Sequence, residues 1–153
     1  MSISSLEPLS ALKNAKTRLL GLDVGEKTVG LALSDISWTI ATPMDTIRRT
    51  KFSKDIQKLQ SIVAEHSVAA LVIGLPINMN GTEGPRCQST RQFATNIQEH
   101  IDIPICFWDE RLSTTAVTRT LLEADVSRKK RAQVIDKMAA SFILQGALDG
   151  LKN

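Results

Sequence analysis

The stretch TRLLGLDVGEKTVGLALSD, residues 17–35, decides how the rest of the chain is interpreted. It contains two short apolar runs, Leu19–Leu22 and Val29–Leu33, joined by a polar turn. Apolar runs of this length on either side of a turn are typical of buried strands that form a hairpin. Asp23 follows directly after the first run, where a carboxylate is costly unless it is solvated, paired or bound to a cation.

Two interpretations of Asp23 follow from this position. In the first, it is a turn aspartate that closes a tight hairpin. In the second, its carboxylate is presented to a metal or to a phosphate-bearing ligand. Gly21, Gly25 and Gly30 keep bulk away from it, and glycine in a strand often marks the close approach of a ligand or of another backbone.

The composition is that of one ordinary globular domain, with 153 residues, 42% of them hydrophobic and 23% charged. We expect a flexible N-terminal lead-in over residues 1–16 and a single domain over residues 17–153. No apolar run is long enough to cross a bilayer, and residues 1–16 lack the apolar core of a secretory signal. Cys87 and Cys106 are too few for a disulfide framework or a zinc cluster. These features predict a cytoplasmic protein with reduced thiols and no membrane partner.

Apolar periodicity predicts the elements that follow the hairpin. These are a strand over 38–47, a helix beginning near Phe52, a strand over 68–75, a helix beginning at Pro85, a strand over 103–108, a helix from Ser113 to about Ala124 and a last helix from near Arg128 to Leu148. Strands separated by helices pair in parallel through right-handed crossovers. The order therefore predicts an α/β fold of the ribonuclease-H type, with a mixed five-stranded sheet flanked by helices.

Carboxylates are predicted to gather at one edge of this sheet. Asp23 ends the first strand, and Asp109 and Glu110 end the fifth. Ligands of open α/β sheets collect beyond the carboxyl ends of the strands. Asp136 lies on the border of the apolar stripe of the last helix, next to Ile143, although a solvent-exposed aspartate would fit that position equally well.

Three carboxylates without a nearby histidine or cysteine favour Mg²⁺ or Mn²⁺ over zinc. The histidines, His66 and His100, fall on the first two predicted helices, where we expect structural or surface roles. Two such cations can activate water and stabilise the leaving oxygen in phosphodiester hydrolysis.

Basic residues also cluster, at the start of the last helix. They are Arg128, Lys129, Lys130 and Arg131. Cations in a first helical turn oppose the helix dipole, but become favourable when a phosphate docks between them. A merely solvated run of charges is the alternative. Arg48, Arg49 and Lys51 form a second, weaker group, and the absence of tyrosine argues for backbone recognition rather than base stacking.

The segment Pro76–Arg86 is predicted to be a loop beside the acids that contacts the substrate. Gly81 and Gly84 allow a backbone to approach closely, and Arg86 can pair with a phosphate. An ordinary connection between a strand and a helix is the alternative.

Four motifs, in order, resemble the YqgF (RuvX-like) family. They are GLDVGEKTVGLALSD (21–35), GLPINMNGTEGP (74–85), DERLST (109–114) and VIDKMAA (134–140), and the resemblance covers nearly the whole chain from about Arg18. Members of this family are described as Holliday-junction resolvases and as nucleases that process the 5′ end of precursor small-subunit ribosomal RNA. They are cytoplasmic and have a ribonuclease-H-like fold.

The resemblance implies catalytic roles for Asp23, for Glu110 with Asp109 beside it, and for Asp136. It also implies that Asp23, Glu110 and Asp136 are the metal ligands. The related RuvC resolvases carry a glutamate after the fourth strand, where this chain has Gly74-Leu-Pro76, so the carboxylate must come from the fifth strand. The expected nucleic-acid-binding residues are Lys27, Arg86, Arg111, Arg128, Lys129, Lys130 and Arg131.

We therefore expect a metal-dependent nuclease, a monomer or a homodimer, that processes the 5′ end of the rRNA precursor. A resolvase acting on branched DNA and a ribosome-assembly factor that binds nucleic acid with little turnover are the alternatives. The segment Asp23-Val-Gly25 also looks like the phosphate loop of sugar kinases and actin-like ATPases. Those proteins need two such domains around a nucleotide, and 153 residues supply only one.

Overall fold

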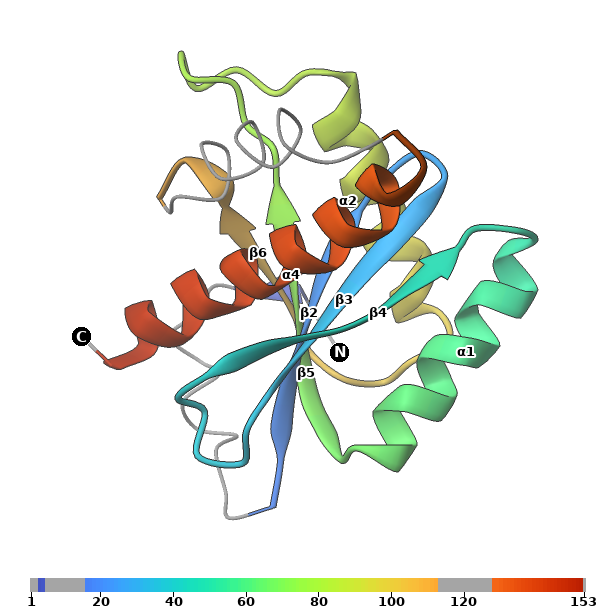
Figure 1. Ribbon diagram of the computed structural model, residues 1–153, viewed down its shortest axis with the longest axis vertical. Coiled ribbons are helices and arrows are strands. Elements are labelled where there is room, and N and C mark those ends of the chain that lie inside the picture. The colour runs from blue at the N-terminus through green and yellow to red at the C-terminus, as the bar shows by residue number, and fades with distance from the viewer. Residues whose placement is uncertain (1–2, 5–15, 113–127, 153) are drawn as a thin grey trace.

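The computed structural model describes residues 3–4, 16–112 and 128–152, with side chains described for 16–112 and 137–151 (Figure 1). Within these ranges a mixed sheet carries helices on both faces. Its strands are β1 (Ile3–Ser4), β2 (Arg18–Val24), β3 (Thr28–Ser34), β4 (Ala41–Arg48), β5 (Val68–Leu75) and β6 (Ile105–Asp109), and its helices are α1 (Phe52–Glu65), α2 (Pro85–Gln98) and α4 (Arg128–Lys152).

The spatial order of the strands is β1-β6-β5-β2-β3-β4. The hairpin of β2 and β3 pairs Asp23 with Gly30, and β4 continues it in the antiparallel sense. β5 pairs in parallel with β2 on one side and with β6 on the other. The predicted α/β sheet is confirmed, and the carboxyl ends of β2, β5 and β6 meet at one edge.

The sheet contains one strand that the sequence did not predict. Ile3 and Ser4 fall within the expected lead-in, yet they pair in parallel with Ile105 and Cys106 of β6. A strand of two residues is too short to show an apolar periodicity, so only its pairing with the edge of β6 identifies it. The rest of the expected lead-in, and the helix predicted from Ser113 to Ala124, lie outside the described residues.

Two strands begin later than predicted. The strand expected from Trp38 begins at Ala41, because Asp35 holds the preceding segment as a turn by accepting hydrogen bonds from the Ser37 hydroxyl and the Thr39 amide. The strand expected from Ile103 begins at Ile105. The residue before it is Pro104, which has no N–H for a ladder.

Two apolar clusters fill the space on the two faces of the sheet. α1 and α2 cover one face, where Ile56, Leu59 and Ile97 pack against strand residues such as Leu22 and Ile73. α4 crosses the other face (Figure 1), where Ile143 and Leu144 belong to a cluster with the strand residues Leu19, Val72 and Trp108. Among the described residues, no helix has the length and apolar character needed to span a bilayer.

α4 lies unusually close to β2. A Cβ atom placed on Gly21 would lie 2.7 Å from Cβ of Leu144 and 3.0 Å from the carbonyl oxygen of Ala140. Any larger residue would push the helix away, so this glycine sets the spacing between α4 and the sheet.

Candidate active site

Two buried carboxylates lie at the carboxyl end of the sheet. Asp23, near the end of β2, is 1% exposed, and Glu110, directly after β6, is 5% exposed. Side chains alternate between faces along a strand, so Asp23 shares the face of Leu19, which packs in the α4 cluster. Glu110 lies on the same face. Its carboxylate and the Ile143 side chain of α4 both lie next to the position that a Cβ on Gly74 would occupy.

Gly74 of β5 stands between the two acids. It pairs with Trp108 of β6, and the preceding residue, Ile73, pairs with Leu22 of β2. A Cβ on Gly74 would lie 3.1 Å from Oε2 of Glu110 and 2.4 Å from Cδ1 of Ile143. The space that a β5 side chain would occupy is therefore taken by the Glu110 carboxylate and by Ile143.

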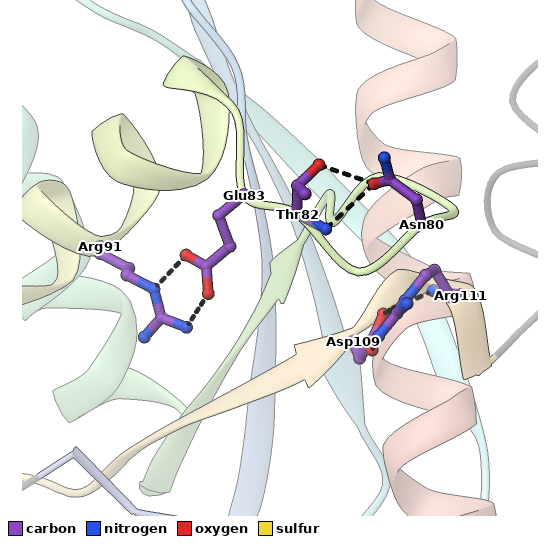
Figure 2. Close-up of polar contacts among 6 residues, drawn as sticks. All are labelled: Asn80, Thr82, Glu83, Arg91, Asp109 and Arg111. Atoms are coloured by element: carbon purple, nitrogen blue, oxygen red, sulfur yellow. Dashed lines mark hydrogen bonds and ion pairs between the residues drawn. The ribbon is translucent and has the colours of Figure 1, made fainter.

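Asp109 and Glu110 are adjacent in sequence but have different surroundings. Asp109 accepts a bidentate pair of hydrogen bonds from Arg111, with Nη2 2.7 Å from Oδ2 and Nε 3.1 Å from Oδ1, and a further bond from the Arg111 amide at 2.9 Å (Figure 2). The hydrogen bonds from the Arg111 side chain hold the pKa of Asp109 below its ordinary value. Glu110, in contrast, is buried against Gly74 at the end of the sheet.

Arg86 links the acids to the surface. Its Nη2 atom lies 3.5 Å from Oδ1 of Asp23, and 48% of its side chain is exposed. The same side chain lines two hollows. One, of about 450 Å³, lies beside Val24 and Gly25, and the other, of about 290 Å³, lies beside Ile77 and Glu110. Arg86 therefore stands between two open spaces that adjoin the carboxylates.

The loop between β5 and α2 is ordered by its own polar side chains. Oδ1 of Asn80 accepts hydrogen bonds from the hydroxyl of Thr82 at 2.6 Å and from its amide at 3.1 Å, and Arg91 of α2 binds Glu83 at 2.7 Å (Figure 2). Gly81 has a φ of +87°, so a turn conformation explains this glycine. Contact of the loop with a substrate stays a prediction.

Asp136 belongs to α4, but its side chain lies outside the described residues. It precedes Ala140 by one helical turn, and the carbonyl oxygen of Ala140 lies 3.0 Å from the Cβ position of Gly21, two residues before Asp23. The backbone thus brings α4 over β2 directly after this position. Among residues with described side chains, no three of histidine, cysteine, aspartate or glutamate gather into a metal site, so the predicted set of three ligands depends on Asp136.

The predicted basic residues fall into separate places. Lys27 is exposed in the turn between β2 and β3, and Arg111 is paired with Asp109. Arg128, Lys129, Lys130 and Arg131 form the first turn of α4, and their side chains lie outside the described residues.

Arg49 is a site residue whose place the sequence did not predict. Its Nη1 atom donates to the carbonyl of Gly25 at 2.7 Å, and its guanidinium lies over the ring of Phe93, 4.9 Å from the centroid. It lines the larger hollow together with Arg86. The only sequence signal was its membership of the weaker basic group with Arg48.

Solved structures with a similar arrangement define the class of fold. Thermus thermophilus RuvC in complex with a Holliday junction substrate superposes with a TM-score of 0.55 at 9% identity, over 90% of this chain and 96% of that one. A second T. thermophilus RuvC structure gives a TM-score of 0.51 at 7% identity, over 87% and 95%. The chain therefore has the ribonuclease-H-like fold of RuvC.

The family is defined by sequence. The RuvX family, described as a Holliday junction resolvase, matches residues 17–150, and this chain belongs to it. The proteins named "Putative pre-16S rRNA nuclease" from Paramagnetospirillum magneticum and from Ruegeria sp. are 62% and 55% identical to it over 149 residues. Each match covers 97% of this chain and at least 95% of the relative.

Proposed function

We propose that this chain is an endonuclease that uses a divalent cation to hydrolyse phosphodiester bonds at the 5′ end of precursor small-subunit ribosomal RNA. The observation that carries the proposal is the pair of buried carboxylates, Asp23 and Glu110, at the carboxyl ends of β2 and β6, the two strands that flank Gly74. The names of its relatives supply the substrate. Such a substrate also implies a cytoplasmic location.

The described residues fit Mg²⁺ or Mn²⁺. Asp23 and Glu110 offer only oxygen ligands, and burying two carboxylates to exposures of 1% and 5% is costly unless cations or hydrogen bonds compensate for the lost solvent. Asp136 would complete the set. When bound, the cation activates water and stabilises the charge that develops on the leaving oxygen. The described histidines do not join the acids, since His100 packs against Phe52 and His66 caps α1.

Arg86 can hold the substrate at this site. Its contact with Asp23 is a single ion pair at 3.5 Å, and half of the side chain is exposed, so the guanidinium can turn towards a phosphate without leaving the site. The Asp109–Arg111 pair supports the rim of the smaller hollow, where Nη1 of Arg111 lies 3.6 Å from the Cβ position of Gly81. The basic residues at the start of α4 would bind the phosphate backbone of the nucleic acid outside the cleavage site.

A resolvase acting on branched DNA is the second candidate. It is favoured by the description of the RuvX family and by a RuvC neighbour whose structure contains a Holliday junction. Both activities use the same carboxylates, so the choice depends on the nucleic acid that the protein holds in place.

The test compares the protein with its Asp23→Asn variant on an RNA that carries the precursor 5′ end and on a four-way DNA junction, with Mg²⁺ or Mn²⁺. We expect cleavage of the RNA by the wild type and none by Asp23→Asn, while the variant still folds and binds RNA. Asp45→Asn, at an exposed position of β4, is the matched control and should cleave normally.

Cleavage of the junction but not of the RNA would show that the substrate is branched DNA rather than RNA. If both proteins bound RNA and neither cut any substrate, the proposal of a nuclease would fail and a ribosome-assembly factor would be the better description.

A further inference from the structure

The larger hollow, lined by Val24 and Gly25, contains an arginine that is held by three contacts. Arg49 is fixed at three points: its amide donates to the carbonyl of Lys27 at 2.8 Å, its Nη1 donates to the carbonyl of Gly25 at 2.7 Å, and its guanidinium lies on the Phe93 ring. A guanidinium has five N–H donors, and these contacts with described residues engage only one of them. Arg49 is therefore a positioned cation with donors left for a ligand.

A second cation and a hydroxyl line the same hollow. Arg86 and Ser89 lie three residues apart on α2, so they share one face of that helix. Among the described residues that line the hollow, Glu26 is the one acidic residue, and it is exposed in the turn after β2. The described lining of this hollow of about 450 Å³ thus holds two arginines and one glutamate.

The hollow directly adjoins the acids. Val24 and Gly25, which line it, follow Asp23 in the chain, and Arg86 contacts Asp23 itself. A nucleic acid whose reacting phosphate lies at Asp23 and Glu110 would bring a neighbouring phosphate into this space. Arginine pairs well with phosphate because its fork of donors matches the phosphate oxygens.

We propose that this hollow is a phosphate subsite, in which Arg49 and Arg86 bind a phosphate group of the nucleic acid next to the one that is cleaved. The inference rests on the proposed nuclease function and names the residues that set the register of its substrate. The phosphate can belong to an internal linkage or to a 5′ end, and the experiment separates these two sources.

The alternative is that Arg49 serves only the fold, by tying the β2–β3 turn to α2 through Gly25 and Phe93. This alternative predicts a loss of stability without a change at any particular phosphate. It is tested with Arg49→Gln and with Arg49→Lys, which keeps the charge and loses the fork. Arg48→Gln, one residue earlier and exposed, is the control with the same change in charge.

The probe is a set of synthetic RNAs of one sequence from the precursor 5′ end. Each carries a single uncharged methylphosphonate linkage at a different position, and each is made with and without a 5′ phosphate. Affinity is measured in EDTA, so the result does not depend on cleavage, and thermal melting of each variant is recorded. A failure of the nuclease proposal would appear only in the cleavage assay, whereas a failure of the subsite appears here.

For the wild type, we expect one neutral linkage, or removal of the 5′ phosphate, to weaken binding about tenfold, the scale of a lost charge-assisted contact. In Arg49→Gln that particular loss should nearly disappear, while Arg48→Gln should retain it. If Arg49→Gln does not fold, Arg49→Lys decides, because it should fold and show a reduced loss. The subsite is refuted if the loss is the same in the Arg49 variants as in the wild type. It is also refuted if no single phosphate matters, or if Arg48→Gln behaves like Arg49→Gln.

Discussion

Replacing Gly74 by alanine tests the central feature of the site, the crowding of Ile143 and Glu110 over this position. The new Cβ would lie 2.4 Å from Cδ1 and 2.8 Å from Cγ1 of Ile143, a side chain with 0% exposure, so α4 or the side chain must shift. Overpacking of this kind costs about 1–3 kcal/mol. In a domain of this size, that corresponds to a fall in Tm of roughly 2–12 °C.

A second substitution separates packing from chemistry. Ile143→Val removes Cδ1, the nearest clashing atom, at a cost of its own of about 0.5–1.5 kcal/mol. The double variant should lose at least about 0.5 kcal/mol less unfolding free energy than the sum of the two single losses, because the valine relieves the clash. The contact between the new Cβ of residue 74 and Oε2 of Glu110, at 3.1 Å, is present in both variants that carry alanine. Cleavage of RNA should therefore be low in Gly74→Ala and equally low in the double variant.

Urea unfolding followed by circular dichroism gives the four free energies of this cycle, and cleavage of the precursor RNA gives the activity. Strictly additive free energies would refute the predicted clash. Recovery of cleavage in the double variant would refute the idea that residue 74 acts on Glu110 directly.

Three further predictions concern charge. Arg86→Ala should weaken RNA binding about tenfold. It should change the free energy of unfolding by less than about 1 kcal/mol, because Arg86 makes one ion pair with Asp23 and half of its side chain is exposed. Melting and affinity measurements check both effects, and a loss of stability with unchanged affinity would contradict the prediction. Converting Lys129 and Lys130 to alanine should lower the slope of log affinity against log salt by roughly one unit for each lysine that contacts a phosphate, so parallel salt plots would show that these residues are only solvated. The Ser37 hydroxyl and the Thr39 amide lower the pKa of Asp35 to about 2. The ionised carboxylate therefore stabilises the turn above pH 3.8, and this contribution is lost as the pH falls towards 2. Urea unfolding should show Asp35→Asn to be less stable by about 1 kcal/mol at pH 7, after allowance for solvent screening, and the difference should vanish near pH 2.

Local patterns of the sequence were sufficient to predict much of the fold. The β2–β3 hairpin, the limits of β5 at Val68 and Leu75 and the start of α2 at Pro85 agree with the predicted elements. Each depends on signals within a few residues, namely the length of an apolar run, the fixed φ angle of proline or the conformational freedom of glycine. The position of Asp23 at the end of a buried strand is predicted for the same reason.

Other features depended on contacts between distant parts of the chain. The pairing of Ile3 and Ser4 with β6 joins residues about a hundred positions apart, so no local pattern indicates it. Whether Asp109 or Glu110 lies over Gly74 depends on the side of the sheet that each faces after β6 ends and on the bond that Arg111 makes to Asp109.

Arg49 shows the same limit most clearly. In the sequence it is one of several basic residues near the end of β4. Its position follows from the carbonyl of Gly25 and the ring of Phe93, which lie 24 and 44 residues away in the chain. The sequence by itself determined which apolar segments form β2 to β6 and which acids stand at their ends, because those depend on local hydrophobicity and backbone preference. The tertiary structure alone decided which side chains share the site, because strand pairing and helix packing bring together residues whose separation in the chain carries no signal of their contact.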